Sequence, residues 1–328
     1  MRRFCLVLVS IALGAPLFPS ALAAQEESAL STHHIAAGLK IACVSLHDGL
    51  GILYVADPAS PKEVGFVPLR APALSSTMVL RIDRYAHRKP GIVFVAQGES
   101  GFAIIDISDP ANAGLMKTVR TAGSAKRLSL MGSVLAVAEG NAGVSIYDVS
   151  NPSEPTYTRT FPIDGTVQNV RQYNGRLFAC AGTAGLFVID IVTGGTAPVP
   201  VAIPTAGDAR DVAFYRNAVF VADGRHGVTL LNLTDRDNPK IVMTLPVKDE
   251  ALEIVFHKSY VFVADGKRGV GYFKFDRPGT LEYLRQLGAD RNYVNHVTVA
   301  DRNLFVSGEF DSVIVFDIHR QDRPKRLR

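Results

Sequence analysis

The sequence of 328 residues contains no tryptophan, only three cysteines and a charged fraction of just 20%. It also lacks several motifs of known chemistry: Cys-x-x-Cys-His for covalent haem, a phosphate-binding loop, a Gly-x-Ser-x-Gly elbow and His-Glu-x-x-His. Apolar residues still make up 47% of the chain, which excludes a disordered protein and provides for a sizeable core. Frequent glycine and proline, with Val, Ile and Phe in short runs, favour strands and turns over helices.

The N-terminal segment has the three parts of a secretory signal peptide. Arg2 and Arg3 precede an apolar run from Phe4 to Leu17, and Ala21-Leu22-Ala23 provides an A-x-A cleavage site. A membrane anchor is disfavoured, because glycine, proline and serine interrupt the run before about 20 apolar residues have accumulated. We therefore predict a signal peptide over residues 1–23 and one mature domain over 24–328. Such a protein is exported to the periplasm, the cell surface or the medium, and does not span the membrane after cleavage.

The charge balance is close to neutral, with a formal net charge of +4 before removal of the two arginines in residues 1–23. This balance excludes a nucleic-acid partner on electrostatic grounds. Basic residues concentrate only at the C-terminal end, over residues 320–328. The sequence allows two interpretations of that segment: a solvated tail, or a contact with an acidic component of the cell envelope.

A repeat of 42 residues dominates the rest of the chain. Its copies have anchors near residues 49, 101, 143, 185, 227, 269 and 312. Around Gly227, apolar runs at 209–215, 218–222, 228–233 and 240–245 predict four strands, separated by Asp-Gly and Asn-Pro turns. Four antiparallel strands in every repeat, without a helical stretch, are typical of a propeller blade. The sequence therefore predicts an all-β fold, a single β-propeller of seven four-stranded blades.

Three features of this predicted ring are irregular. The first interval is longer than the others, and Asp83–Pro90 is predicted to be a long loop between the first two strands of the second blade. The outer strand of the last blade comes either from Pro324–Arg328 or from Gln25–Leu30. Cys43 and Cys180 fall on nearly opposite blades inside apolar strands, so we predict buried free thiols rather than a disulfide.

The repeat also resembles a known family. Val-Phe-Val-Ala-Asp-Gly-x-x-Gly-Val occurs at 219–228 and 261–270, and Ile-Ile-Asp-Ile-Ser-Asp-Pro at 104–110. These motifs look like the LVIVD repeat of exported bacterial and archaeal proteins, and the period is similar to that of YVTN-type surface propellers. The resemblance covers essentially the whole mature chain and implies a secreted or cell-surface propeller, in a family whose members mostly lack an assigned activity. Without tryptophan, the repeats do not resemble WD40 blades or those of quinoprotein dehydrogenases.

Acidic residues recur at two turns of the repeat. The third strand ends in Asp in four copies but in other residues elsewhere, which indicates a turn-stabilising role rather than a reactive one; the residues are Asp106, Asp148, Asp190 and Asp317, replaced by Tyr54, Asn232 and Lys274. The turn between the second and third strands carries Glu139, Asp223 and Asp265. At such a tight turn we predict that the side chains cap the backbone.

One repeat position is polar where its neighbours are apolar. Sixteen residues before each anchor, at the start of the first strand, stand His33, Arg127, Asn169, Asp211, Glu253 and His296, with the second blade ambiguous over Ser75–Thr77. That strand lines the central channel of a propeller, so we predict that this ring forms a ligand-binding site at the channel mouth. Asp211, Glu253, His296 and His33 belong to consecutive blades and have the ligand types of a divalent-cation site. The other interpretation is a solvated lining whose charges pair across blades.

These observations favour a non-enzymatic binding or interaction scaffold that uses its top face. A protein or peptide partner, or an envelope component, is expected there, and a small polar ligand fits the same face. No catalytic residue and no cofactor is assigned. The alternative is a metal-dependent hydrolase or lyase with a divalent cation in the channel, so the sequence leaves enzymatic activity open while favouring its absence.

Overall fold

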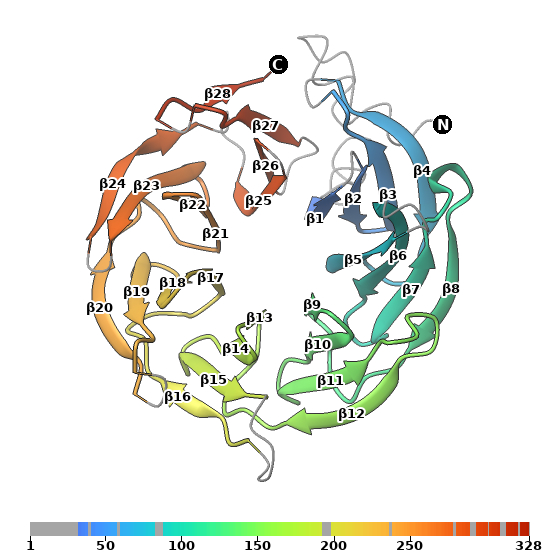
Figure 1. Cartoon of the computed structure of the whole chain (residues 1–328), viewed down its shortest axis with the longest axis horizontal. Helices are drawn as coiled ribbons and strands as arrows, with labels where there is room; N and C mark the ends of the chain where they lie inside the picture. Colours follow the sequence, from blue (N-terminus) through green and yellow to red (C-terminus); the bar gives the residue numbers. More distant parts are fainter. Residues whose placement is uncertain are drawn as a thin grey trace, which may run out of the picture.

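The computed structural model describes residues 32–38, 41–57, 60–82, 88–191, 198–235, 238–277, 280–288, 293–300, 302–308, 313–320 and 322–327. Seven four-stranded antiparallel sheets surround a central channel, one sheet to each propeller blade (Figure 1). The predicted all-β fold and the predicted number of blades are confirmed. The predicted signal peptide, residues 1–23, lies outside the described residues.

The strands of each blade run from the channel to the rim in chain order (Figure 1). Blades 1 and 2 contain β1 (Thr32–Gly38), β2 (Ile41–Leu46), β3 (Gly49–Tyr54), β4 (Lys62–Pro68), β5 (Ser75–Ile82), β6 (Arg88–Ala96), β7 (Phe102–Asp106) and β8 (Gly114–Val119). A short 3-10 helix, η2 (Pro110–Asn112), lies between β7 and β8. Blades 3 and 4 contain β9 (Arg127–Met131), β10 (Val134–Ala138), β11 (Val144–Asp148), β12 (Thr156–Phe161), β13 (Asn169–Tyr173), β14 (Arg176–Cys180), β15 (Leu186–Asp190) and β16 (Val201–Ile203). Blades 5 to 7 contain β17 (Asp211–Tyr215), β18 (Ala218–Ala222), β19 (Val228–Asn232), β20 (Lys240–Leu245), β21 (Glu253–His257), β22 (Tyr260–Ala264), β23 (Val270–Arg277), β24 (Thr280–Leu287), β25 (Val294–Ala300), β26 (Asn303–Gly308), β27 (Ile314–Asp317) and β28 (Lys325–Arg326).

The hydrophobic core lies between the blades. Each of the seven interfaces between adjacent blades has its own cluster of buried apolar side chains. Between blades 5 and 6, for example, Phe220 and Leu230 pack with Val263 and Phe273. Every residue of β18 is buried, because this strand is covered on both faces by neighbouring blades. A single blade would leave these apolar faces in water, so the blades depend on one another for stability.

The turn between the second and third strands joins each blade to the next. In blade 5, Gly224 and Gly227 both have positive φ, which glycine adopts without steric penalty. The Gly224 N–H donates to the Ala251 carbonyl at 3.2 Å, and the Ala251 N–H donates back at 2.8 Å. The same bridge recurs between other pairs of adjacent blades, at Gly98 and Ala125, Gly140 and Val167, Gly182 and Ala209, and Gly266 and Val294. The loops that enter the channel strands are therefore fixed at their bases.

The acidic residue that ends the third strand stabilises a turn, as predicted. The Asp148 Oδ1 atom accepts a hydrogen bond from the Ser150 N–H at 2.8 Å. Asn232, which replaces the aspartate in blade 5, accepts the same bond from the Thr234 N–H at 2.8 Å. An amide oxygen serves as well as a carboxylate here, which explains why the repeat tolerates the replacement.

The ring closes by packing between blades 7 and 1. The C-terminal segment supplies β28, which pairs with β27, so the first of the two predicted sources is confirmed, while Gln25–Leu30 lies outside the described residues. Phe305 and Val315 of blade 7 pack with Ala42 and Val44 of blade 1. Over the described residues, each blade draws its four strands from one continuous segment of chain.

The predicted long loop of blade 2 is shorter than expected. Residues 88–90 belong to β6, where Arg88 pairs with Ile82 and Pro90 pairs with Leu80. A register shift between Val79 and Leu80 accompanies this pairing. The loop prediction over Asp83–Pro90 was therefore wrong for its last three residues, because the irregular register lets the proline continue the strand. Residues 83–87 lie outside the described residues.

Cys43 in β2 and Cys180 in β14 are buried free thiols, as predicted. Burial raises the pKa of Cys43 to about 12. Burial, together with the charge of Asp211, also raises the pKa of Cys180 above its ordinary value. The thiolate is the nucleophile, so a chain comprising residues 24–328 is expected to react slowly with Ellman's reagent at a pH of about 8. Both thiols should react at once in denaturant. Rapid labelling of the native protein would contradict the buried placement.

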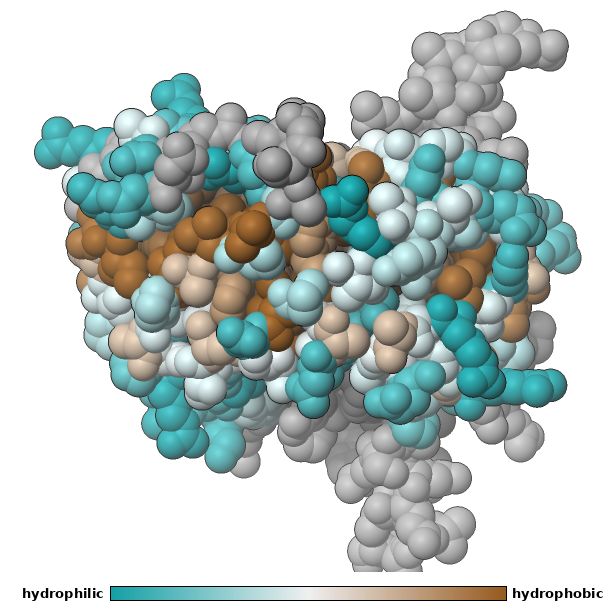
Figure 2. All heavy atoms as spheres, turned by 90° about the horizontal axis from the view of Figure 1, so that it is seen from below, coloured by the Kyte–Doolittle hydropathy of each residue, from teal (hydrophilic) through white to brown (hydrophobic). Residues whose placement is uncertain are grey.

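The outer wall of the ring carries exposed apolar side chains among hydrophilic ones. In Figure 2, which shows this wall from the side, they gather toward the left of the view. Exposed residues of the outer strands include Leu115, Met116, Tyr157, Val201, Ile241 and Val242. None of the described helices is long and apolar enough to cross a bilayer.

Candidate functional site

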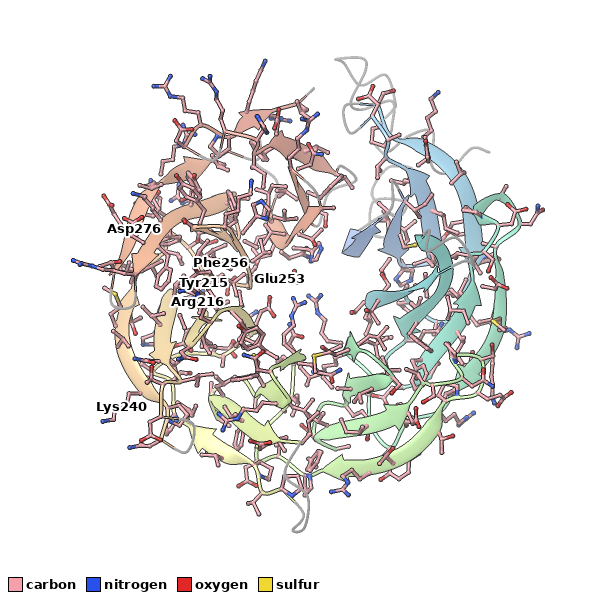
Figure 3. All side chains as sticks on the ribbon, in the orientation of Figure 1. Tyr215, Arg216, Lys240, Glu253, Phe256 and Asp276 are labelled. Carbon is pink, nitrogen blue, oxygen red and sulfur yellow. The ribbon has the colours of Figure 1, made fainter. Side chains whose placement is uncertain are left out.

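The structure places the predicted polar ring at the channel ends of the innermost strands. Arg127, Asn169, Asp211 and Glu253 are the first residues of β9, β13, β17 and β21, and His296 is the third residue of β25. Glu253 lies at the channel end of blade 6 in Figure 3, whereas Lys240 lies on the outer rim of blade 5.

The structure adds information on the ring positions of blades 2 and 1. Ser75 takes the position in blade 2, since it pairs with Ala96 as Asp211 pairs with Ala222, and this settles the ambiguity of the sequence. In blade 1 the prediction is one residue out of register: His33 falls at the irregularity between Thr32 and His34 in β1, and His34 pairs with Ser45 as His296 pairs with Ser307. The side chains of β1 lie outside the described part of the structure.

Asp211 is the most fully bonded member of the ring. Its side chain is buried and accepts a hydrogen bond from the Asn169 Nδ2 atom at 2.8 Å. The Arg171 guanidinium donates through Nε at 2.9 Å and through Nη2 at 3.1 Å, one bond to each carboxylate oxygen. The Ile254 N–H donates a fourth bond at 3.1 Å. Asp211 thus connects blades 4, 5 and 6. Its four hydrogen bonds use all the acceptor positions of the carboxylate.

Glu253 forms the second anionic centre. Its Oε1 atom lies 3.3 Å from the Arg171 Nη2 atom and 3.5 Å from the Arg127 Nη1 atom. Its Oε2 atom is in close contact with the Nδ1 atom of His296, and both side chains are buried. A carboxylate on one ring nitrogen fixes the orientation of an imidazole. The network therefore connects six side chains from blades 3 to 7, five of the ring together with Arg171, which supports the interpretation that the charges pair across blades.

Arg171 is the functional residue that sequence reasoning missed. It stands two residues after Asn169 on β13, so both side chains project from the same face of the strand. Burial lowers the pKa of Arg171, but the charges of Asp211 and Glu253 and the bonds to Asp211 raise it above its ordinary value. The available signal was a charged residue in the middle of a predicted channel strand, on the same face as the ring residue Asn169.

The bonds of Asp211 and Glu253 affect whether the candidate metal ligands could bind a cation. Among the described residues, no three or more His, Cys, Asp or Glu side chains are grouped as a metal ion requires. Asp211 and Glu253 share the guanidinium of Arg171 rather than facing a common open point. A cation held by Asp211, Glu253 and His296 would have to displace Arg171, since these oxygens already bind its N–H groups.

A cavity of about 490 Å³ opens above the ring, at the channel mouth. Its walls come from the residues just before the channel strands of six blades: Leu74, Ser124, Lys126, Arg127, Gln168, Asp208, Arg210, Leu252, Tyr293 and Asn295. Only two of these side chains, both leucines, are apolar. The cavity is therefore lined mainly by hydrogen-bonding groups, and it shares Arg127 with the ion-pair network.

The turn acids hold these loops in place. The Glu139 Oε2 atom accepts a bond from the Gly123 N–H at 3.2 Å, and the Asp223 Oδ2 atom accepts one from the Gly207 N–H at 3.2 Å. The predicted capping role is thereby confirmed. Burial raises the pKa of Glu139 above its ordinary value, although its hydrogen bonds, including those from the Gly123 and Ala122 backbone, work in the opposite direction.

Part of the chain matches a known sequence repeat. The sequence model of the LVIVD repeat matches residues 91–121, 122–161 and 206–242. The chain carries LVIVD repeats at these three positions. The three matched LVIVD repeats fall in blades 2, 3 and 5 and include Arg127 and Asp211 of the ring. The resemblance stated from the sequence is confirmed.

Other comparisons inform only the fold of this LVIVD-repeat chain. No curated protein matches it. The crystal structure of the computationally designed Ika8 protein aligns with a TM-score of 0.68 and 11% identity, over 92% of this chain and 86% of that one. A chain of the mitotic checkpoint complex aligns with a TM-score of 0.67 and 12% identity, over 97% of this chain and the whole of that one. At such low identity the likeness shows a shared propeller fold and nothing of activity.

Proposed function

We propose that this protein is an exported, non-enzymatic binding protein that receives its ligand or partner at the channel mouth. The observation that carries the proposal is the cavity of about 490 Å³, with polar walls drawn from six blades. A concave site with converging polar groups is the default location for binding. Export is supported by the signal-peptide pattern over residues 1–23.

The state of the ring acids supports binding over catalysis. A general base or a metal ligand needs a lone pair that faces the substrate. Asp211 accepts four hydrogen bonds from neighbouring protein groups, and Glu253 is buried against Arg171 and His296. Their role in the proposal is to hold the arginines under the cavity. No specific observation favours the metal-dependent hydrolase or lyase, so it is not part of the proposal.

The proposal is tested by filling the cavity. Ser124 lines it, so Ser124→Tyr should occlude the mouth without altering any charge. Purified 24–328 would be immobilised and exposed to an extract of the envelope fraction, and retained proteins and small molecules would be identified by mass spectrometry. We expect one component that wild type retains and Ser124→Tyr loses by about tenfold or more.

The matched control is Thr118→Tyr, which adds the same side chain to an exposed position of the outer strand β8. It should retain the component as wild type does. Equal retention by wild type, Ser124→Tyr and Thr118→Tyr would place the interaction away from the channel mouth and refute the proposal. Metal-dependent turnover of a lactone or phosphoester by the purified protein would refute its non-enzymatic part.

A further inference from the structure

The charged side chains at the channel mouth differ in exposure. Asp211 and Glu253 are almost completely buried, while the side chains of Arg127 and Arg171 are 21% and 36% exposed. Of these four side chains, Arg127 lines the cavity. A ligand in the cavity can therefore contact the Arg127 guanidinium, whereas the carboxylate of Glu253 that pairs with it is closed to solvent.

The wall adds a cation whose charge is not neutralised. The Lys126 Nζ atom donates to the amide oxygen of Gln168 at 3.0 Å, and no carboxylate of the described residues lies within ion-pair distance of it. Arg210, by contrast, is paired with Asp208 through Nη2 at 2.7 Å and Nε at 2.8 Å, and its Nη2 atom also lies 3.6 Å from Glu250. The one acidic side chain among the lining residues is thus held by an arginine, which leaves Lys126 as the open charge of the wall. Arg127 pairs with Glu253 at 3.5 Å but is 21% exposed, so its guanidinium also remains accessible to an anion.

Neutral hydrogen-bonding groups complete the lining. The Oδ1 atom of Asn295 is buried and has no hydrogen-bond partner. Such an orphaned acceptor is costly unless a donor reaches it. The hydroxyl of Ser124 and the amide of Gln168 line the same cavity. A ligand that fits must therefore carry donors, such as hydroxyl groups, besides its negative charge.

We infer that the cavity binds a small hydroxylated organic anion, with its acidic group at Lys126 and Arg127 and its hydroxyl groups at Asn295 and Ser124. This rests on the proposed function, because it assigns a ligand class to the same cavity. The volume of about 490 Å³ lies within the usual range of small-molecule sites. Charge-assisted hydrogen bonds to lysine and arginine supply the affinity, and the bridges that fix the loop bases reduce the ordering cost of binding.

The test is titration calorimetry with defined probes, on the chain comprising residues 24–328. Gluconate and glucose 6-phosphate are both six-carbon polyhydroxylated anions, one with a carboxylate and the other with a phosphate, and they distinguish the two sources of negative charge. Glucose is the neutral counterpart, and inorganic phosphate lacks the carbon chain. We expect saturable binding of one molecule of gluconate or glucose 6-phosphate per chain, weakening as salt is added, and no binding of glucose.

Lys126→Gln removes the open charge and keeps a hydrogen-bonding side chain. We expect it to weaken binding of the anion by about tenfold or more. Lys240→Gln makes the same change on the outer rim, where Figure 3 places Lys240, and should leave the affinity unchanged. Circular dichroism of both variants establishes that they fold.

Three outcomes would overturn the inference: no saturable binding of either organic anion, equal affinity for glucose, or an affinity that Lys126→Gln leaves intact. Equal binding of inorganic phosphate would reduce the site to an adventitious anion contact and also overturn it. The retention experiment with Ser124→Tyr reports separately on the proposed function. A retained macromolecule that Ser124→Tyr loses, with no anion bound, would preserve that function and remove this ligand class.

Discussion

Replacement of Asp211 by alanine is expected to lower the free energy of unfolding by about 3 to 5 kcal/mol, the usual loss when one partner of a buried ion pair is removed. The substitution leaves Asn169 without its acceptor, leaves Arg171 with Glu253 as its remaining partner and leaves the Ile254 N–H unsatisfied. Because these bonds join Asp211 of blade 5 to blades 4 and 6, the loss should appear in the cooperative unfolding of the whole ring. Urea unfolding followed by circular dichroism measures it.

Asp208→Ala is the matched control. Asp208 also pairs with an arginine, Arg210, but its side chain is 35% exposed. An exposed pair contributes about 0 to 1 kcal/mol, so this variant should unfold close to wild type. If the two variants lose the same stability, then burial of Asp211 does not matter and the network is an ordinary solvated lining.

Gly227→Ala should cost about 3 kcal/mol or more, from the sum of a left-handed backbone penalty and steric overlap. Gly227 has a φ of +95°, and an added Cβ atom would overlap the Leu245 carbonyl oxygen and lie 2.8 Å from the Pro246 Cα atom. The obstacle is backbone of the outer strand β20 and the loop after it, which cannot move without shifting the next blade. Thermal unfolding of the variant should begin at a clearly lower temperature.

Gly132→Ala isolates the steric part of this prediction. Gly132 also has a positive φ, of +60°, but an added Cβ atom meets nothing within 4 Å. Only the backbone penalty remains, about 1 to 2 kcal/mol. A Gly227→Ala variant that is no less stable than Gly132→Ala would show that the Leu245 carbonyl yields easily, and would contradict the rigidity ascribed to these turns.

The fold could be predicted closely, because each blade repeats the same pattern of four apolar strands separated by turns. The four apolar runs around Gly227 coincide with β17 to β20 within two residues at their ends, since turn chemistry sets the boundaries. The irregular strand register could not be predicted from the sequence. The pairing of Pro90 with Leu80 depends on a register shift between β5 and β6, at Val79 and Leu80, and no local sequence pattern predicts that shift.

The candidate site could be predicted in position but not in bonding. The period placed Arg127, Asn169, Asp211 and Glu253 at equivalent strand starts, and the structure has them there. Which side chain meets which depends on the angle between neighbouring blades, and this is a tertiary property. Arg171 escaped notice because it lies outside the repeated position. It is nevertheless the group that binds both Asp211 and Glu253.

The junction between blades 7 and 1 differs from the other junctions of the ring in how the chain connects the two blades. Adjacent blades elsewhere are linked by the chain that passes from one outer strand to the next channel strand, but β28 and β1 are not consecutive in the chain. Phe305 and Val315 pack there against Ala42 and Val44. The stability of this junction therefore depends on contacts between residues far apart in the sequence, so the first and last blades must both be folded before the ring can close.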